Sequence, residues 1–165
     1  MAPVPPSPVA IGGDHAGLPL KRALQEALAA GGHELLDFGT NEAASVDYPD
    51  FAHRVCAAVQ DGRARFGVLV CGSGIGMAIA ANRHRGIRAA VLHDATEARL
   101  TRAHNDANVA AFGARLVGPE VALDALKAFL STPYEGGRHD KRLAKLLPPD
   151  PSPGSCRVQG PRRHS

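Results

Sequence analysis

The segment Phe66–Gly76, FGVLVCGSGIG, joins an uninterrupted apolar run to a glycine-rich turn. Residues 66–70 are β-prone and apolar, which is typical of a strand that a sheet buries on both faces. In the turn of residues 71–76 glycine alternates with small residues, and residues 77–82 are expected to form a short helix. The segment therefore predicts a strand, a tight turn and a helix, the repeating unit of an α/β sheet.

The same alternation of β-prone runs and helical periodicity extends to both sides of this segment. Repeated five times, it predicts an α/β sandwich with a mostly parallel sheet, in which ligands bind at the carboxyl ends of the strands. The expected strands are residues 9–12, 33–38, 66–70, 87–92 and 109–112. The expected helices are centred on residues 18–28, 48–59, 77–82, 98–103, 121–130 and 141–147.

Proline-rich ends bound this pattern in a chain of 165 residues, about the length of one domain. We expect a folded domain over residues 9–147, between a disordered extension of residues 1–8 and a disordered tail of residues 148–165. Cys156 lies in that tail and is expected to be an exposed thiol without a structural role.

The composition argues against several classes of partner. A net charge of +3 with 4% aromatic residues and no Trp is weak support for a nucleic-acid surface, which needs a basic face with stacking aromatics. No apolar run approaches the roughly 20 residues of a membrane span, and the first residues lack the features of a signal peptide. The three cysteines form no C-x-x-C pair. We therefore expect a cytoplasmic protein with no nucleic acid and no membrane as partner.

The turn of residues 71–76 is the strongest candidate site. Its glycines allow backbone N–H groups to converge on an anion. Met77 stands where a dinucleotide fingerprint needs glycine and where a cysteine phosphatase needs arginine, and a P-loop lysine is absent. Cys71 begins the turn at a strand end, an environment that stabilises a thiolate. The alternatives are a turn without a ligand and a Cys71 that is only a small buried hydrophobe, as we expect of Cys56.

Three further segments carry polar residues that could contact a ligand. Residues 12–17, GGDHAG, follow the first strand. His104 stands beside two amides at another strand boundary, where a helix C-terminal cap is the alternative. Arg138 and Arg142 suit a phosphate if they share a helical face, and solvated surface arginines are the alternative. The spacing of possible ligands does not predict a metal site. Four histidines without a partner motif are expected at the surface: His33, His53, His84 and His164.

Eight ordered motifs between Val9 and Leu147 carry a family resemblance. They are GDHAG (13–17), DYP (47–49), CGSGIG (71–76), AAN (80–82), GIRAA (86–90), HNDAN (104–108), FGAR (112–115) and YEGGRH (134–139). With these motifs the chain closely resembles the type B ribose-5-phosphate isomerases, a family that includes the galactose-6-phosphate isomerase subunits.

The resemblance implies a Rossmann-like three-layer sandwich with five parallel strands, and a homodimer or dimer of dimers whose sites use two subunits. It also implies interconversion of ribose 5-phosphate and ribulose 5-phosphate through an enediolate, without a metal or other cofactor. Cys71 matches the catalytic base of one branch and His104 the group that opens the sugar ring. The loop that stabilises the enediolate is matched by Gly72, Ser73, Gly74, Ile75 and Gly76. Further substrate contacts are matched by Asp14, His15, Asn105, Arg115, Arg138 and Arg142.

One branch of the family uses a glutamate just after the last glycine of the turn. Met77 stands there and the cysteine is present, so the chain resembles the cysteine branch. Three alternatives stay open. The first is the same chemistry on a hexose 6-phosphate or a tetrose 4-phosphate. The second is a phosphosugar-binding sensor without activity, in which Cys71 and His104 would be unnecessary. The third, a cysteine hydrolase, lacks a clear base and acid around Cys71.

Overall fold

A five-stranded parallel sheet forms the centre of the structure, a computed structural model that describes residues 7–147. Its strand order is β2-β1-β3-β5-β4, and every pair of neighbours is parallel, so the predicted sheet is confirmed. The strands are β1 (Val9–Gly13), β2 (Leu35–Asp37), β3 (Phe66–Cys71), β4 (Ala89–Val91) and β5 (Val109–Gly113). Residues 1–6 of the extension predicted for residues 1–8, and the predicted tail of residues 148–165 with Cys156, lie outside the described residues.

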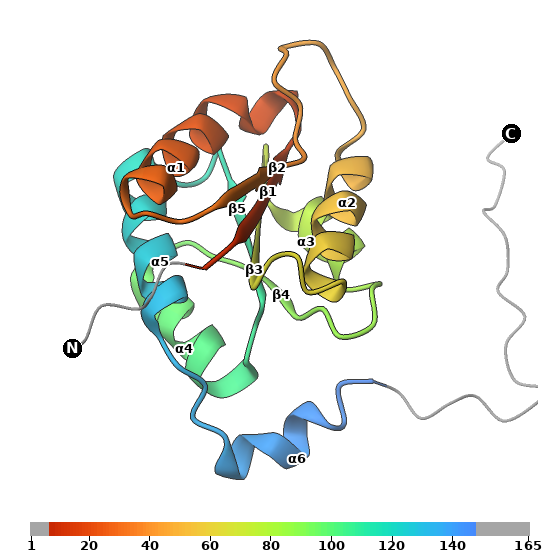
Figure 1. The fold of residues 1–165 in the computed structure, drawn as a ribbon, viewed down its shortest axis with the longest axis vertical. Helices are drawn as coiled ribbons and strands as arrows, with labels where there is room; N and C mark the ends of the chain where they lie inside the picture. The colour runs from red at the N-terminus through yellow and green to blue at the C-terminus, as the bar shows by residue number, and fades with distance from the viewer. Residues whose placement is uncertain (1–6, 148–165) are drawn as a thin grey trace, which may run out of the picture. The chain divides into compact units, whose positions relative to one another are not determined.

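Helices cover both faces of this sheet, which gives the expected three layers (Figure 1). One face carries α1 (Leu18–Ala30), α4 (Ala95–Asn105) and α5 (Pro119–Ser131). The other carries α2 (Tyr48–Gln60) and α3 (Ile75–Ala81). Because side chains alternate along a strand, Val68 and Val70 of β3 enter the first layer of core. Leu69 and Cys71 enter the second.

The second layer also contains Cys56, which is fully buried in α2. Burial raises the pKa of its thiol to about 12, since the thiolate would lose its hydration there. The prediction that Cys56 serves packing is therefore confirmed. In the same layer Gly67 passes so close to α2 that an added Cβ would lie 2.8 Å from Val55 Cγ1.

Several predicted boundaries were wrong by a few residues. The strand expected at 87–92 is only Ala89–Val91, because the Asn108 side chain bonds Gly86 O and Arg88 N in place of a strand partner. The helix expected to start at Met77 begins at Ile75.

The described chain divides into two compact units, with the boundary between Glu135 and Gly136. The first contains the whole sheet and helices α1 to α5, after a short 3-10 turn η1 (His15–Gly17). The second contains the 3-10 turn η2 (Gly137–His139) and α6 (Asp140–Leu143). The helix predicted for residues 141–147 was wrong in its bounds: α6 spans only Asp140–Leu143, with Ala144 as its C-cap. Among the described residues no helix is long and apolar enough to cross a membrane.

Candidate active site

The carboxyl ends of β1, β3 and β5 meet at one edge of the sheet. The strand register pairs Gly13 with Val70 and Cys71 with Gly113. The residues that follow these strands therefore lie side by side and form an open cleft of about 540 Å³. The lining residues are Asp14, His15, Ala16, Tyr48, Cys71, Gly72, Ser73, Ile75, Gly76, Arg115 and Leu116.

Cys71 lies at the floor of this cleft, with 4% of its surface exposed. The N–H of Gly74 donates a hydrogen bond to its Sγ at 3.1 Å. Within the described residues, the N–H groups of Gly72 and Ser73 have no acceptor. The turn thus presents backbone donors beside a sulfur atom, the arrangement that can stabilise a thiolate and a neighbouring oxyanion.

Close backbone packing explains why the turn uses glycine. Gly74 has φ +75°, and a Cβ on it would lie 2.9 Å from the carbonyl carbon of Phe112. From the opposite side, a Cβ on Gly113 would lie 2.6 Å from Ser73 O. The loops after β3 and β5 therefore touch main chain to main chain. The glycines are required by this contact as well as by the turn itself.

Asp14 and His15 follow β1 and form a second wall. Asp14 is buried, and its Oδ1 accepts from Gly17 N at 2.9 Å, which caps the short turn η1. Its own N–H donates to Val70 O at 3.1 Å, so the residue is fastened to β3. His15 is half-buried, and its Nδ1 accepts a hydrogen bond from Val46 N at 3.2 Å. The backbone of Asp14 and the ring of His15 are therefore held in place at the edge of the cleft.

Arg115 brings a positive charge over the glycine turn. Its N–H donates to Gly72 O at 3.0 Å, and a Cβ on Gly72 would lie 3.4 Å from the guanidinium carbon. Any side chain at position 72 would compete with the guanidinium for this space. Ser73 adds a hydroxyl, whose Oγ accepts from Ile75 N at 3.3 Å.

The single chain does not bring every expected site residue into the cleft. His104 and Asn105 are the last residues of α4, which starts at the carboxyl edge after β4 and ends at the amino edge before β5. At about 3.3 Å per residue, β5 alone separates the two edges by roughly 15 Å. His104 Nε2 lies 3.9 Å from Glu135 Oε2.

The second unit carries the two arginines expected near a phosphate. Arg138 lies in η2 and donates through Nε to His139 Nε2 at 3.2 Å, and Arg142 lies in α6. Both arginines are exposed. They stand in two successive helical segments rather than in one helix.

Sequence reasoning missed three residues that line the cleft, Ala16, Tyr48 and Leu116. The most informative is Tyr48, at the start of α2. Its ring lies directly against the turn, since a Cβ on Gly76 would lie 2.6 Å from Tyr48 Cζ. The signal for Tyr48 was its place at the start of a helix, the end of a helix that faces the ligand edge of such a sheet.

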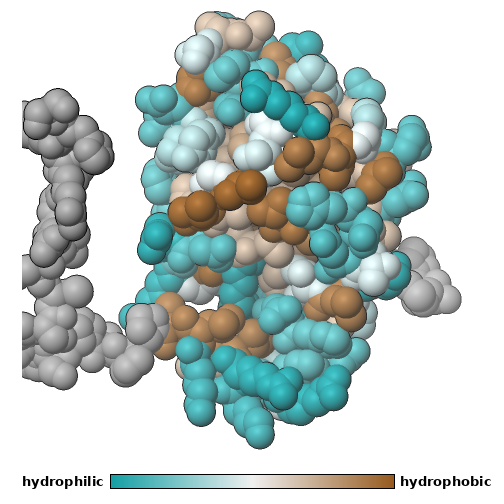
Figure 2. All heavy atoms as spheres, turned by 180° about the vertical axis from the view of Figure 1, so that it is seen from behind, coloured by the Kyte–Doolittle hydropathy of each residue, from teal (hydrophilic) through white to brown (hydrophobic). Residues whose placement is uncertain are grey.

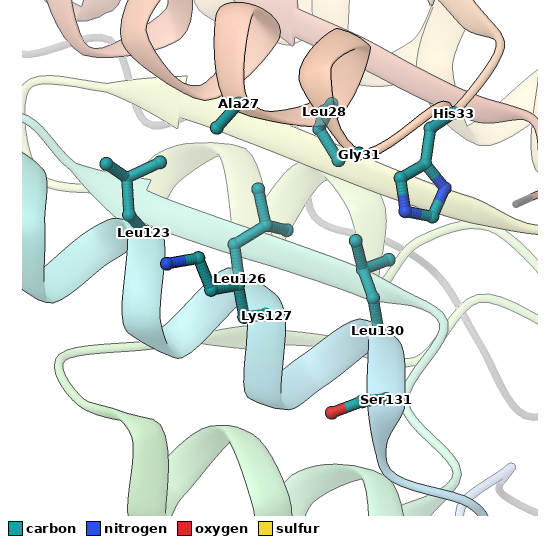
Figure 3. A pocket seen from close by; sticks show the side chains of 9 residues that line it. All are labelled: Ala27, Leu28, Gly31, His33, Leu123, Leu126, Lys127, Leu130 and Ser131. Atoms are coloured by element: carbon teal, nitrogen blue, oxygen red, sulfur yellow. The ribbon is translucent and has the colours of Figure 1, made fainter. Parts of the chain in front are cut away.

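A second cavity, of about 320 Å³, lies between α1 and α5 (Figure 3). Figure 3 shows Leu123, Leu126 and Leu130 of α5 pointing toward α1, with His33 at one end. Its lining is mainly apolar and includes no group of converging polar side chains that could hold a phosphorylated sugar. The cleft at Cys71 is therefore the better candidate site.

Two histidines expected at the surface contact each other away from the cleft. His53 Nδ1 lies 2.7 Å from His84 Nε2, and partial burial together with the charge of His53 lowers the pKa of His84. His33 is half-buried and hydrogen-bonded to the backbone of Ser7, so its expected surface position was only partly correct.

Known proteins share this fold. A model of the ribose/galactose isomerase family matches residues 9–146. The chain belongs to that family. It is 45% identical to ribose-5-phosphate isomerase B of Escherichia coli over 138 residues, which cover 84% of this chain and 93% of the relative. It is also 39% identical to D-erythrulose-4-phosphate isomerase of Pectobacterium atrosepticum over 139 residues, 84% of this chain and 91% of the relative.

A solved structure gives the same result. The ribose-5-phosphate isomerase B of Clostridium thermocellum superimposes with a TM-score of 0.83 at 46% identity, and the match covers 84% of this chain and 94% of that one. The expected family, the Rossmann-like sandwich and the enzyme class of sugar isomerases are thus confirmed.

Proposed function

We propose that this protein interconverts ribose 5-phosphate and ribulose 5-phosphate through an enediolate, without a metal or other cofactor. Cys71 is the base, and His104 of a second subunit opens the sugar ring. The observation that carries the proposal is the position of Cys71 Sγ in a cleft that also contains backbone donors, a carboxylate, an imidazole and a guanidinium.

The chemistry needs one group that moves a proton between two adjacent carbons. In the open-chain aldose, the Cys71 thiolate takes the proton from C2, and the electron pair of that bond forms the C1–C2 double bond of the enediolate. The resulting thiol returns the proton to C1, and the proton on O2 passes to O1, which leaves the carbonyl at C2. The Gly74 N–H, 3.1 Å from Sγ, stabilises the thiolate before each cycle.

The enediolate needs hydrogen-bond donors that are already oriented when its charge develops. The N–H groups of Gly72 and Ser73, which have no acceptor among the described residues, supply them. A preorganised donor of this kind is worth about 3 kcal/mol in the transition state. Gly74 and Gly76 support these donors by keeping the turn against Phe112 and Tyr48.

The other polar groups bind the parts of the substrate that do not react. Asp14, His15 and Ser73 bind hydroxyl groups, and Arg115 offers a guanidinium to the phosphate or the adjoining oxygen. Arg138 and Arg142, with Asn105, add further contacts from the subunit that supplies His104. Binding energy from the phosphate orients C1 and C2 at the base.

The position of His104 supports a homodimer or a dimer of dimers. His104 ends a helix at the amino edge of the sheet, whereas Cys71 lies at the carboxyl edge. A second copy of the chain can present its own His104 and Asn105 to the cleft. In a dimer with two-fold symmetry the same arrangement then forms two equivalent sites.

Exposed apolar side chains beside the cleft support the same assembly. Ile75 and Ile79 of α3 are 53% and 54% exposed, and Leu116 is 57% exposed. Figure 2 shows brown, hydrophobic patches among hydrophilic side chains on the back of the molecule. Because Ile75 and Leu116 also line the cleft, a subunit that covers them would reach the reacting sugar.

The test is a substrate panel on the purified protein with a chelator present. We expect turnover of ribose 5-phosphate with the chelator, and a loss of about 10³-fold in kcat for Cys71→Ala with nearly unchanged binding of the sugar phosphate. Cys56→Ala is the matched control and should keep its turnover. Near-normal turnover by Cys71→Ala would contradict the assignment of the base, and dependence on a metal would contradict the metal-free mechanism.

Mixing two inactive variants tests the shared site. In a heterodimer of Cys71→Ala and His104→Ala, one of the two sites has both wild-type side chains. After random exchange about half of the dimers are mixed, so about a quarter of the wild-type activity should return. No recovery, with exchange of subunits verified by native mass spectrometry, would contradict a site built from two chains.

The Pectobacterium atrosepticum relative favours a second candidate, a tetrose 4-phosphate as substrate. Comparing kcat/KM on pentose, tetrose and hexose phosphates distinguishes the candidates, and binding without turnover of any of them would identify a sensor. We place the protein in the cytoplasm, where thiols such as Cys56 and Cys71, both free in the structure, stay reduced.

A further inference from the structure

A distant loop determines which nitrogen of His15 carries a proton. Val46, 31 residues away, donates its backbone N–H to His15 Nδ1 at 3.2 Å. A backbone N–H can only donate, so Nδ1 must offer its lone pair. The ring proton of the neutral imidazole is then on Nε2, the nitrogen left to the cleft that His15 lines.

The loop that contains Val46, residues 38–47, is itself fastened by a buried cation. The side chain of Lys21, on α1, is 0% exposed. Its Nζ donates to Asp37 Oδ1 at 2.8 Å, Asp37 Oδ2 at 3.1 Å and Asn41 Oδ1 at 3.0 Å. An ammonium group has three protons, so these contacts use the full capacity of Lys21. Lys21 therefore joins α1, the end of β2 and the start of the loop.

Backbone contacts bring the same loop against the strand that leads to His15. Thr40 N donates to Gly13 O at 3.1 Å, and Phe38 N donates to Ile11 O at 2.8 Å. A Cβ on Gly39 would collide with Gly13 N. The start of the loop, residues 38–41, thus packs against the end of β1, the strand that leads to His15.

We infer that His15 binds the substrate as a hydrogen-bond donor through Nε2–H, and that Lys21, Asn41 and the Val46 amide are positioning residues that hold this tautomer. The inference deepens the proposed function. It rests on that function only for the identity of the hydrogen-bond acceptor, which is an oxygen of the sugar phosphate. Asp14, the adjacent residue, is a carboxylate and can only accept when ionised. One sugar hydroxyl can therefore accept a hydrogen bond from His15 and donate one to Asp14. A fixed donor beside a fixed acceptor selects a hydroxyl group, which can do both.

The tautomer can be measured without any assumption about activity. Two-bond ¹H–¹⁵N correlation spectra of the full-length protein with ¹⁵N-labelled histidine distinguish the two ring nitrogens, and His15→Gln identifies the signals of His15. We expect the neutral form of the ring to carry its proton on Nε2. A proton on Nδ1, or a mixture of both tautomers, would overturn the inference even if the protein is an active isomerase.

Two substitutions of His15 test which nitrogen reaches the substrate. The amide nitrogen of glutamine can occupy the position of Nε2, whereas that of asparagine reaches only the position of Nδ1. We expect His15→Gln to keep KM within about threefold of the wild-type value and His15→Asn to raise it about tenfold, the loss expected for one hydrogen bond. A better KM for His15→Asn than for His15→Gln would show that Nδ1 is the functional nitrogen.

Asn41→Ala tests the positioning role with a mild change. It removes one of the three acceptors of Lys21 and leaves the Lys21–Asp37 pair in place. We expect KM to rise about three- to tenfold, kcat to stay within about twofold, and a second tautomer of His15 to appear in the spectra. Ala43→Ser, at an exposed position of the same loop, is the control and should change none of these. A lower kcat with unchanged KM and tautomer would assign Asn41 a purely structural role and overturn this part.

Discussion

The buried Lys21–Asp37 pair allows a quantitative test of what holds the site in place. Replacing Asp37 by Asn removes a charge but keeps a side-chain oxygen that can accept from Lys21. Lys21 would then be a fully buried ammonium without a counter-charge, since its side chain is 0% exposed. Removing one partner of a fully buried pair costs about 3–5 kcal/mol.

Two features of the structure reduce that figure. The Asp37 side chain is 28% exposed, so part of its interaction with Lys21 is already screened by water. Asn41 Oδ1 also remains as an acceptor at 3.0 Å. We therefore expect Asp37→Asn to lower the free energy of unfolding by about 2–3 kcal/mol at neutral pH, measured by urea unfolding at one fixed protein concentration.

The effect should depend on pH in a direction that follows from the pKa of Asp37. Partial burial alone would raise this pKa, but hydrogen bonds from Lys21, Gly39 and Gln25 and the charge of Lys21 together lower it below 3.8. The carboxylate therefore stabilises the folded state fully above pH 3.8, and this contribution is lost as the pH falls through the lower folded-state pKa. The difference between wild type and Asp37→Asn should shrink below about pH 4.

The matched control is Asp61→Asn. Asp61 pairs with Arg63 at 3.6 Å, but the two side chains are 63% and 52% exposed. Such a pair is worth less than about 0.5 kcal/mol. If Asp37→Asn proves as mild as Asp61→Asn, or if its effect persists unchanged at acid pH, the buried pair is not what fastens this part of the fold.

Two further substitution and labelling experiments test the turn and the core. Gly74→Ala combines a positive φ with a Cβ 2.9 Å from the Phe112 carbonyl carbon, whereas Gly62→Ala has φ +72° with nothing within 4 Å. Because alanine disfavours a positive φ, both variants should lose about 1–2 kcal/mol of unfolding free energy. Only Gly74→Ala should also lower kcat/KM. Equal activity of the two variants would contradict the role of the contact between Gly74 and Phe112. The thiol of Cys56, with its pKa raised to about 12, should resist iodoacetamide at pH 8 in the folded protein and react in urea, as followed by peptide mass analysis. Alkylation of Cys56 at the same rate in both states would contradict its burial.

The sequence predicted the parts of the fold that depend on short-range patterns. The apolar run of residues 66–70 and the glycines after it are local signals, and the structure has β3 and the turn there. The strand at residues 87–92 was predicted too long because its end depends on the distant side chain of Asn108, which replaces strand hydrogen bonds. The helix after His139 was also predicted too long, since α6 ends at Leu143 and periodicity gives no signal for that end.

The candidate site divides in the same way. Asp14, His15 and Cys71 could be proposed from their places after apolar strands, because the carboxyl ends of parallel strands share one edge. Tyr48 lines the cleft only because α2 brings its ring onto Gly76, a contact between residues 28 positions apart in the sequence. The contact of Val46 with His15 depends on the path of an irregular loop, which periodicity does not describe.

The position of His104 follows from topology alone. In a parallel sheet each connecting helix starts at the carboxyl edge and returns the chain to the amino edge, so the last turn of that helix lies opposite the ligand-binding edge. His104 is in the last turn of α4, and Cys71 ends β3 at the other edge. No rearrangement of side chains within one sheet closes a gap of roughly 15 Å. If both residues act on one sugar, they belong to different chains, and the dimer is then a requirement of the chemistry rather than a means of stabilising the fold.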